Sequence, residues 1–142
     1  MTLVLDASMA LSWLLKRKDA AEAEQSRQGL DALRASGAVV PPLWYAELAN
    51  ILLLAERQRV ITAEEARGFL TGLSDWAIVQ DPIPPVLTQP QVIHLGRVYG
   101  LTAYDATYLE SAMRQGAALA TFDRKLATAA RAAGIRVFGD PV

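Results

Sequence analysis

The chain has 142 residues, 52% of them hydrophobic, which suits one well-filled core better than two, so we predict a single domain over residues 1–142. The absence of cysteine excludes disulfides and thiolate metal sites, and the net charge of -1, from 14 Lys and Arg against 15 Asp and Glu, does not by itself indicate a nucleic-acid partner. The longest apolar run, Ile51–Ala55, is far below the roughly 20 residues of a membrane helix, and the N-terminus lacks a signal-peptide pattern, so we predict a cytoplasmic protein.

Strands and helices alternate in the first part of the chain. Leu3–Leu5 is a short apolar run typical of a buried strand, and a helix over residues 9–15, capped near Ser8, follows it. The next predicted elements are a helix over 19–35, a strand over 38–40, an apolar helix over 43–59, a helix from the Thr62–Glu65 capping box to about 76, and a strand over 77–80.

The C-terminal part of the chain continues this alternation. After a rigid connection, Asp81–Pro85, helical periodicity resumes over residues 89–99. The remaining predicted elements are a helix over 103–115, a strand over 117–121, a helix over 124–133 and a strand over 135–138. Alternation with crossover-length connections favours an α/β fold, in which helices cover both faces of a parallel sheet. Ligands of such sheets bind beyond the carboxyl ends of the strands.

Four acidic residues fall where that edge of the sheet is expected. Asp6 follows the predicted strand Leu3–Leu5, and Asp123 follows the predicted strand over 117–121, so both belong at the carboxyl ends of strands. Glu47 lies inside the apolar helix, and Asn50, three residues on, adds a polar group to the same face. Asp105 lies one turn into a helix that is otherwise mostly apolar. The order of the elements allows all four acids to meet at one cleft.

Each acid also has a structural explanation. Asp105 could complete a capping arrangement with Thr102, and Asp123 could be the N-cap of its own helix. Asp6 could accept hydrogen bonds from backbone N–H groups in the turn between strand and helix. Glu47 has the weakest structural explanation, because the exposed edge of so apolar a helix would be narrow.

A cluster of four carboxylates would need protons or cations to be tolerated. Two unit charges about 4 Å apart repel by roughly 4 kcal/mol at an effective dielectric near 20. Hard divalent cations such as Mg²⁺ or Mn²⁺ prefer carboxylate oxygens and keep positions for water and phosphate. If cations neutralised the four acids, 11 acids would face 14 bases, and the excess of three positive charges would suit a polyanionic substrate.

Four blocks of sequence resemble a known family. The blocks are VLDAS (4–8), AELAN (46–50), LTAYDATYLESA (101–112) and LATFDRKL (119–126). In their order and spacing they resemble the PIN-domain ribonucleases, particularly the VapC-type toxins of type II toxin-antitoxin systems, from residue 3 to about residue 138. The resemblance implies a three-layer α/β/α sandwich around a central parallel sheet of about five strands.

The resemblance also implies a reaction and a metal site. By position, it implies that the four acids are catalytic residues and the ligands of one or two Mg²⁺ or Mn²⁺ ions. These acids are Asp6, Glu47, Asp105 and Asp123. The implied activity is that of an endoribonuclease, in which a metal-activated water hydrolyses an RNA phosphodiester bond. The chain would then be the toxin of a toxin-antitoxin pair.

Polar and basic neighbours of the acids have implied roles as well. Ser8, Asn50 and Thr121 match polar positions of the family that would orient carboxylates, water or phosphate. Arg124 and Lys125 follow Asp123 directly and could contact the RNA substrate, but they could equally form a solvated helix face.

Two protein partners are implied by the resemblance. Family members commonly form homodimers and bind a cognate antitoxin, whose C-terminal segment occupies the active-site groove. Five apolar residues exceed what one small core needs and suit such an interface, with core packing as the equal alternative: Trp13, Leu14, Trp44, Leu53 and Leu54.

Other phosphoryl-transfer families fit the sequence less well. Haloacid-dehalogenase-like enzymes would have Asp-x-Asp where this chain has Asp6-Ala-Ser8, and there is no Gly-rich phosphate loop. The single histidine, His94, lies in a helix outside the four blocks, so we predict a surface or packing role for it. The remaining alternative is a PIN-like module that binds or sequesters a partner with little or no turnover.

Overall fold

Four short apolar runs form one parallel sheet in the computed structural model, which describes residues 2–141. The strands are β1 (Leu3–Leu5), β2 (Ala38–Val40), β3 (Ile78–Gln80) and β4 (Ala118–Ala120). They lie in the order β3-β2-β1-β4, and each neighbouring pair is parallel. The predicted α/β fold with a central parallel sheet is therefore confirmed, and β1 occupies an inner position.

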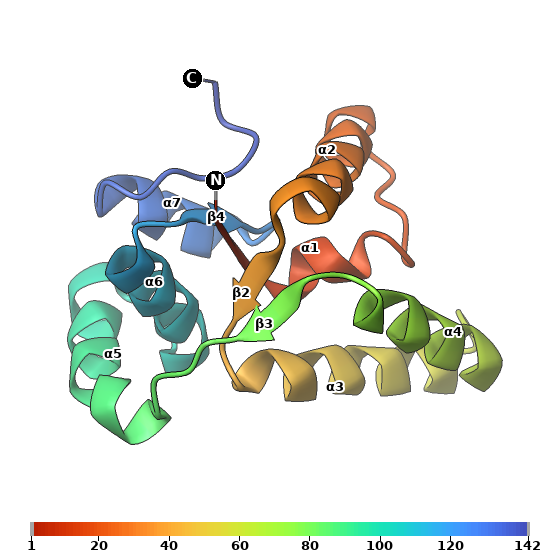
Figure 1. The fold of residues 1–142 in the computed structure, drawn as a ribbon, viewed down its shortest axis with the longest axis horizontal. Coiled ribbons are helices and arrows are strands. Elements are labelled where there is room, and N and C mark those ends of the chain that lie inside the picture. The colour runs from red at the N-terminus through yellow and green to blue at the C-terminus, as the bar shows by residue number, and fades with distance from the viewer. Residues whose placement is uncertain (1, 142) are drawn as a thin grey trace.

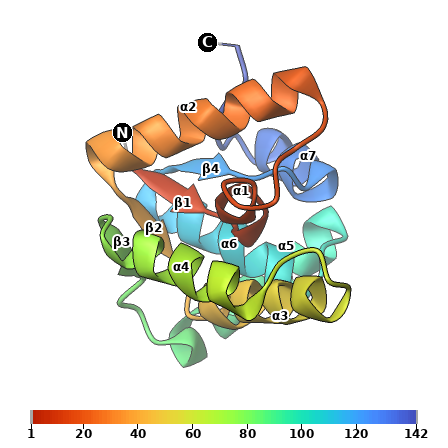
Figure 2. The ribbon, with the colours of Figure 1, turned by 90° about the vertical axis from the view of Figure 1, so that its right-hand side faces the viewer.

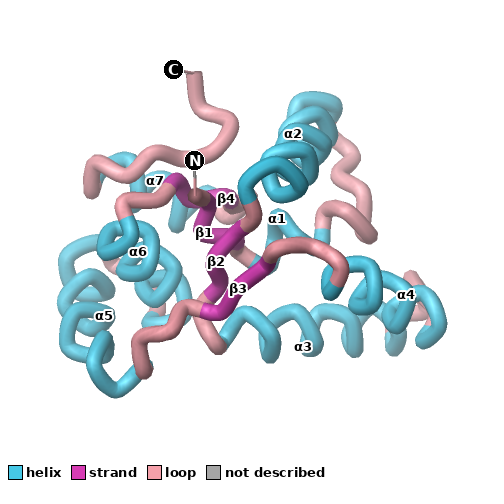
Figure 3. The backbone as a smooth tube through the Cα atoms, viewed as in Figure 1, coloured by secondary structure: helices cyan, strands magenta, loops and turns pink. Residues whose placement is uncertain are grey.

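Helices cover both faces of this sheet. They are α1 (Ala7–Leu11), α2 (Ala20–Ser36), α3 (Leu43–Arg57), α4 (Ala63–Ser74), α5 (Pro85–Tyr99), α6 (Ala103–Gln115) and α7 (Arg124–Ala132). Figure 1 shows α5, α6 and α7 on one side of the sheet and α1, α2 and α4 on the other, and Figure 2 shows this second group from the front. The backbone trace in Figure 3 shows the strands as the middle layer of the three.

The core is centred on β1, β4 and α6. Every residue of β1 and of β4 is buried, and α6 packs against both strands. Tyr108 and Leu109 of α6 have no exposed surface. The Thr102 side chain caps the start of α6, and Gly116 ends the helix with a left-handed backbone, so local signals alone define its length.

Three predicted elements differ clearly from the structure. Helix α1 covers Ala7–Leu11 and begins after Asp6, whereas a helix over residues 9–15 was predicted. Helix α5 begins at Pro85 rather than at residue 89, because a proline fits the first turn of a helix, where its missing N–H needs no partner. The predicted strand over 135–138 is reduced to one isolated bridge between Leu119 and Val137. Gly134 and Gly139, which have positive φ angles, end the extended segment on both sides. The sheet of the described residues therefore has four strands instead of about five.

The positions of individual side chains confirm some of the remaining expectations and correct others. The capping box at the start of α4 forms as predicted, and His94 is exposed on α5. Of the apolar residues that suited either an interface or the core, Trp44 is buried in the core, and Trp13 and Leu14 pack against it. Only Leu53 and Leu54 remain largely exposed, at 46% and 43%. No helix within residues 2–141 has the length and apolar character to cross a membrane.

Candidate active site

Asp6 lies at the carboxyl end of β1 and is 8% exposed. Its Oδ2 atom accepts a hydrogen bond from Ser8 Oγ at 2.8 Å and another from Thr121 Oγ1 at 2.5 Å. Ser8 belongs to α1, which follows β1, and Thr121 directly follows β4. Two hydroxyl groups from neighbouring strand ends thus fix the orientation of one buried carboxylate.

The same two hydroxyl groups also hold the chain after β4. Ser8 Oγ accepts a hydrogen bond from the N–H of Phe122 at 2.9 Å, and Thr121 Oγ1 accepts one from the N–H of Asp123 at 2.9 Å. Each hydroxyl donates to Asp6 and accepts from a backbone N–H, so each one links the carboxylate to the chain after β4. The segment 121–123 is therefore fixed in position relative to Asp6.

Asp123 has the capping role that its sequence position allows. Its Oδ1 atom accepts a hydrogen bond from the N–H of Leu126 at 2.9 Å, and this contact begins α7. The residue is exposed. A carboxylate has two oxygens with several acceptor sites, so a cap made by Oδ1 is compatible with a further contact of the same group.

Glu47 has a buried partner that the sequence analysis did not identify. The hydroxyl group of Tyr108 donates to Glu47 Oε1 at 2.5 Å, which joins α6 to α3. Burial raises the pKa of Glu47, the hydrogen bond from Tyr108 opposes this rise, and the charges of Asp6 and Asp105 add to it. The only signal for Tyr108 in the sequence is its spacing of three residues from Asp105, which places the two on adjoining faces of α6.

Asp105 combines a local role with strong electrostatic perturbation. Its N–H donates to Thr102 Oγ1 at 3.2 Å, so the backbone of Asp105 takes part in the cap while its carboxylate makes no capping hydrogen bond to the described residues. Burial, together with the charges of Asp123 and Asp6, raises the pKa of Asp105 to about 6, and the positive charge of Lys125 partly opposes this. At neutral pH this carboxylate is ionised, although its surroundings disfavour the charged form.

Electrostatic repulsion connects all four acids. Burial raises the pKa of Asp6, and the charge of Asp123 raises it further, although the hydrogen bonds from Thr121 and Ser8 oppose the change. Asp6 in turn acts on both Glu47 and Asp105. No Lys or Arg within residues 2–141 forms an ion pair with any of the four. The structure thus brings these acids into one region, where no ion pair within residues 2–141 offsets their mutual repulsion.

The donor set suits a hard divalent cation in its chemistry, since it offers carboxylate oxygens without a competing cation. Its arrangement is more open than a finished metal site. Within residues 2–141, no three His, Cys, Asp or Glu side chains form a group that could hold a metal ion. The acids are therefore electrostatically coupled but are not arranged as a closed set of ligands.

The remaining residues singled out in the sequence lie around these acids. Asn50 is exposed on α3, one turn beyond Glu47, and makes no side-chain hydrogen bond to the described residues. Arg124 and Lys125 are exposed in the first turn of α7. Lys125 is close enough to Asp105 to influence the pKa of that residue.

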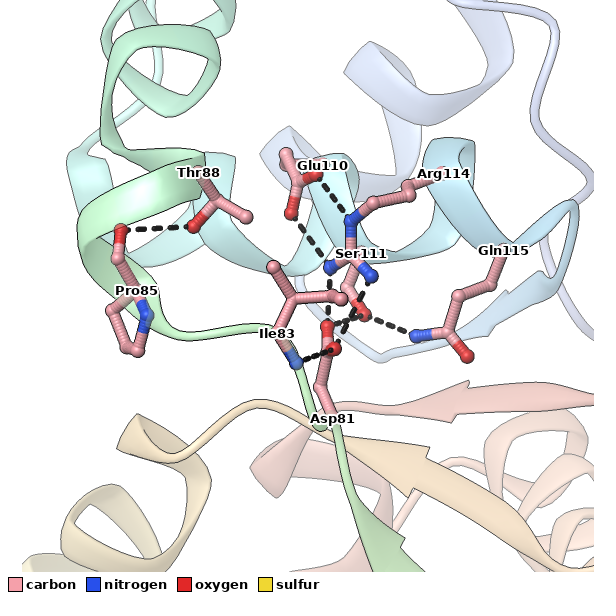
Figure 4. Close-up of polar contacts among 8 residues, drawn as sticks. All are labelled: Asp81, Ile83, Pro85, Thr88, Glu110, Ser111, Arg114 and Gln115. Atoms are coloured by element: carbon pink, nitrogen blue, oxygen red, sulfur yellow. Dashed lines mark hydrogen bonds and ion pairs between the residues drawn. The ribbon is translucent and has the colours of Figure 1, made fainter.

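A second charged cluster, also missed in the sequence analysis, supports α6 from its other side. Figure 4 shows the Arg114 guanidinium between the carboxylates of Glu110 and Asp81, with Ser111 also bound to Asp81. Asp81 directly follows β3 and is 5% exposed. Burial alone would raise the pKa of Asp81, but hydrogen bonds from Arg114, the N–H of Ile83 and Ser111 outweigh burial and lower it. One guanidinium binds both carboxylates, so the cluster ties α6 to the end of β3.

Comparisons with known proteins agree with this architecture. The crystal structure of PAE2754 from Pyrobaculum aerophilum is 25% identical, with a TM-score of 0.64, over 91% of this chain and 79% of that chain. The crystal structure of FitAcB from Neisseria gonorrhoeae is 19% identical, with a TM-score of 0.64, over 97% of this chain and 96% of that chain, a likeness of fold. No curated protein matches the sequence. The sequence pattern described as PIN domain matches residues 3–132, and the chain therefore belongs to the PIN domain family.

Proposed function

We propose that this protein is a metal-dependent endoribonuclease that acts as the toxin of a toxin-antitoxin pair. The observation that carries the proposal is the coupling of Asp6, Glu47, Asp105 and Asp123 in one region of a PIN domain, where no basic side chain of residues 2–141 neutralises them. PIN domains are generally metal-dependent nucleases. RNA as the substrate, Mg²⁺ or Mn²⁺ as the cation and the role as toxin rest on the resemblance of the four sequence blocks to VapC-type proteins.

The four acids would hold one or two divalent cations. A bound cation of this kind lowers the pKa of a water molecule and stabilises charge on phosphate oxygens. Ser8 and Thr121 would keep Asp6 ionised and correctly oriented, because a hydrogen bond to the charged form of a carboxylate stabilises that form. Tyr108 would orient Glu47 and stabilise its charged form in the same way, through its own hydrogen bond. The open arrangement of the acids implies small side-chain adjustments on binding.

Substrate and partners complete the proposal. Arg124 and Lys125, exposed beside Asp123, would contact RNA phosphates. A homodimer and a cognate antitoxin in the cytoplasm are the proposed assembly partners. The exposed pair Leu53 and Leu54 on α3 is the part of the predicted apolar interface that is free to take part in it.

A direct test is cleavage of a fluorescently labelled single-stranded RNA with Mg²⁺ or Mn²⁺, with EDTA, and with Asp6→Asn or Asp105→Asn. We expect activity that requires the cation and falls by at least 100-fold in either variant, on the scale of a lost catalytic ligand. Asp31→Asn is the matched control, since Asp31 is exposed on α2 and outside the acid cluster. Cleavage that survives EDTA and both substitutions would exclude the metal mechanism.

Because the acids are openly arranged, the same experiment also tests the alternative of a binding module without turnover. If RNA or an antitoxin binds tightly while no RNA is cleaved under any cation, the protein is a sequestering PIN-like module. A small adjacent reading frame that encodes a DNA-binding protein would support the toxin assignment over a general nuclease.

A further inference from the structure

An aromatic side chain lies beside the acids, at a position where the mechanism has no use for it. Phe122 separates Thr121, which binds Asp6, from Asp123. Its backbone N–H is fixed by Ser8 Oγ at 2.9 Å, and its ring is only partly buried against the core. The backbone of Phe122 is therefore fixed relative to the acid cluster, and its ring is not fully used for packing.

A guanidinium group lies over one face of this ring. The Arg17 guanidinium carbon lies 4.5 Å from the centre of the Phe122 ring, a cation–π contact. Glu22 Oε2 accepts a hydrogen bond from Arg17 Nη2 at 3.1 Å, which fixes the guanidinium from a second side. Arg17 lies between α1 and α2, and Glu22 lies in the first turn of α2, so a distant part of the chain covers one face of the Phe122 ring.

Phe122 also lines a cavity of about 300 Å³. Asp123 lines one side of the cavity, and Arg131 lines another. Arg131 donates two hydrogen bonds to Asp140, from Nε to Oδ2 at 2.7 Å and from Nη2 to Oδ1 at 2.8 Å. Arg124 lines the same space and forms no ion pair with any residue of the described range 2–141. The volume lies at the lower end of the range for small-molecule pockets, which suits one planar group with an attached phosphate.

These three features match the chemistry of an unpaired nucleotide. Single-stranded bases stack on aromatic rings and on Arg guanidinium planes, whereas bases in a duplex are already stacked on one another. The phosphate next to such a base could contact Arg124, which lies at the same cavity as the Phe122 ring.

We propose that Phe122, supported by Arg17, is a stacking subsite for one nucleobase of single-stranded RNA, next to the phosphate that the acid cluster would cleave. This inference rests on the proposed function and assigns a substrate-positioning role that the function itself does not require. Loss of the ring would weaken RNA binding by roughly 5- to 150-fold, the effect of losing one base–aromatic stack.

The test is a binding measurement in which no RNA is cleaved. The full chain, in EDTA and at low salt, is titrated with a short single-stranded RNA that contains 2-aminopurine, whose fluorescence falls when the base stacks. We expect quenching with the wild-type protein, weaker binding without quenching for Phe122→Leu, and recovery of both in Phe122→Trp. Phe69→Leu is the matched control, because Phe69 is another partly buried phenylalanine, on α4.

A second measurement uses the wild-type protein and so does not depend on the folding of a variant. A single abasic nucleotide is moved along the RNA, and one position should lose affinity by at least 5-fold, while fully double-stranded RNA should not quench. A flat abasic scan, or a folded Phe122→Leu protein that binds and quenches like the wild type, would overturn the stacking subsite. Equal quenching by a single-stranded DNA of the same sequence would keep the base subsite and remove its preference for RNA.

The two proposals can fail separately. Metal-dependent cleavage together with a flat abasic scan removes the subsite and leaves the nuclease. Quenching that depends on Phe122, with no cleavage under any cation, removes the nuclease and leaves the subsite as part of a binding module.

Discussion

The hydroxyl group of Tyr108 on α6 donates a hydrogen bond to Glu47 on α3, and the two oxygen atoms are 2.5 Å apart. Tyr108 has no exposed surface, and burial, with the nearby charges of Asp6 and Glu47, raises its pKa, so it stays protonated as a donor. Glu47 therefore has a fixed rotamer although its helix face is partly open to solvent. The contact connects the helix that carries Asp105 with the helix that carries Glu47.

Tyr108→Phe should weaken divalent-cation binding, because it removes this donor and leaves the ring in place. Loss of an outer contact that orients a metal ligand typically reduces affinity by about 10- to 100-fold. The hydrogen bond lowers the pKa of Glu47, so its removal raises that pKa, and the loss should be larger at pH 6 than at pH 8. Calorimetric titration with Mn²⁺ at both pH values measures this. Tyr104→Phe, at an exposed tyrosine of the same helix, is the control.

Thr121→Val should destabilise the fold, because the hydroxyl of this 3% exposed residue both donates to Asp6 and accepts from the N–H of Asp123. Asp6 keeps its hydrogen bond from Ser8, but it loses one of its two hydroxyl donors and the N–H of Asp123 loses its acceptor, at a cost of about 1–3 kcal/mol. Thr128→Val, in the exposed part of α7, should change the free energy of unfolding by less than about 0.5 kcal/mol. Urea unfolding compares the two variants, and equal effects would show that the contact with Asp6 is not important for stability.

Local structure was readable from the sequence where it depends on near neighbours. The bounds of α6 were predicted correctly because Thr102 and Gly116 mark its ends, and the Thr62 capping box did the same for the start of α4. The start of α5 was placed too late, because a run of prolines indicates a loop as readily as a first helical turn. The strand predicted over 135–138 is only a single bridge, because the glycines on both sides limit its length more than its apolar pattern extends it.

Contacts across the fold could not be predicted in the same way. Tyr108 and Glu47 are 61 positions apart, and Arg114 and Asp81 are 33 apart, so each pair depends on how helices and strands pack. Helical spacing predicts the face on which a residue lies but not the residue that meets it. The sequence therefore indicated the four acids, and the family resemblance indicated Ser8 and Thr121 beside Asp6, whereas Tyr108, the partner of Glu47, was visible only in the structure.

Asp105→Asn should stabilise the metal-free protein at high pH. Burial and the charges of Asp123 and Asp6 raise the pKa of Asp105 from 3.8 to about 6. The folded state thus binds this proton more tightly than the unfolded state. The resulting stability is full below pH 3.8 and is lost as the pH rises through 6. At pH 8 the substitution should add roughly 1 kcal/mol, after allowance for solvent screening at this partly exposed position.

The comparison with Asp31→Asn, an exposed acid on α2, separates this effect from a general change in charge. Thermal unfolding at pH 4 and pH 8 measures it, and an equal effect at both values would contradict the assignment. Saturating Mn²⁺ should reverse the order at pH 8, because a cation that binds only the folded state stabilises the wild type more than a variant with fewer ligands.

Arg114→Leu should destabilise the protein strongly at neutral pH, because it leaves the buried carboxylates of Asp81 and Glu110, 5% and 6% exposed, without their cation. Removal of one partner from a buried ion pair costs about 3–5 kcal/mol, and the 30% exposure of the Arg114 side chain favours the lower end. Arg114 holds the pKa of Asp81 below its usual value, so the loss should shrink toward pH 4, where Asp81 of the variant can take up a proton. Arg27→Leu, in the exposed pair with Glu24, should change stability by less than about 0.5 kcal/mol. Urea unfolding of both variants at pH 7 and pH 4 measures these effects, and a small, pH-independent loss in Arg114→Leu would show that the cluster does not anchor α6.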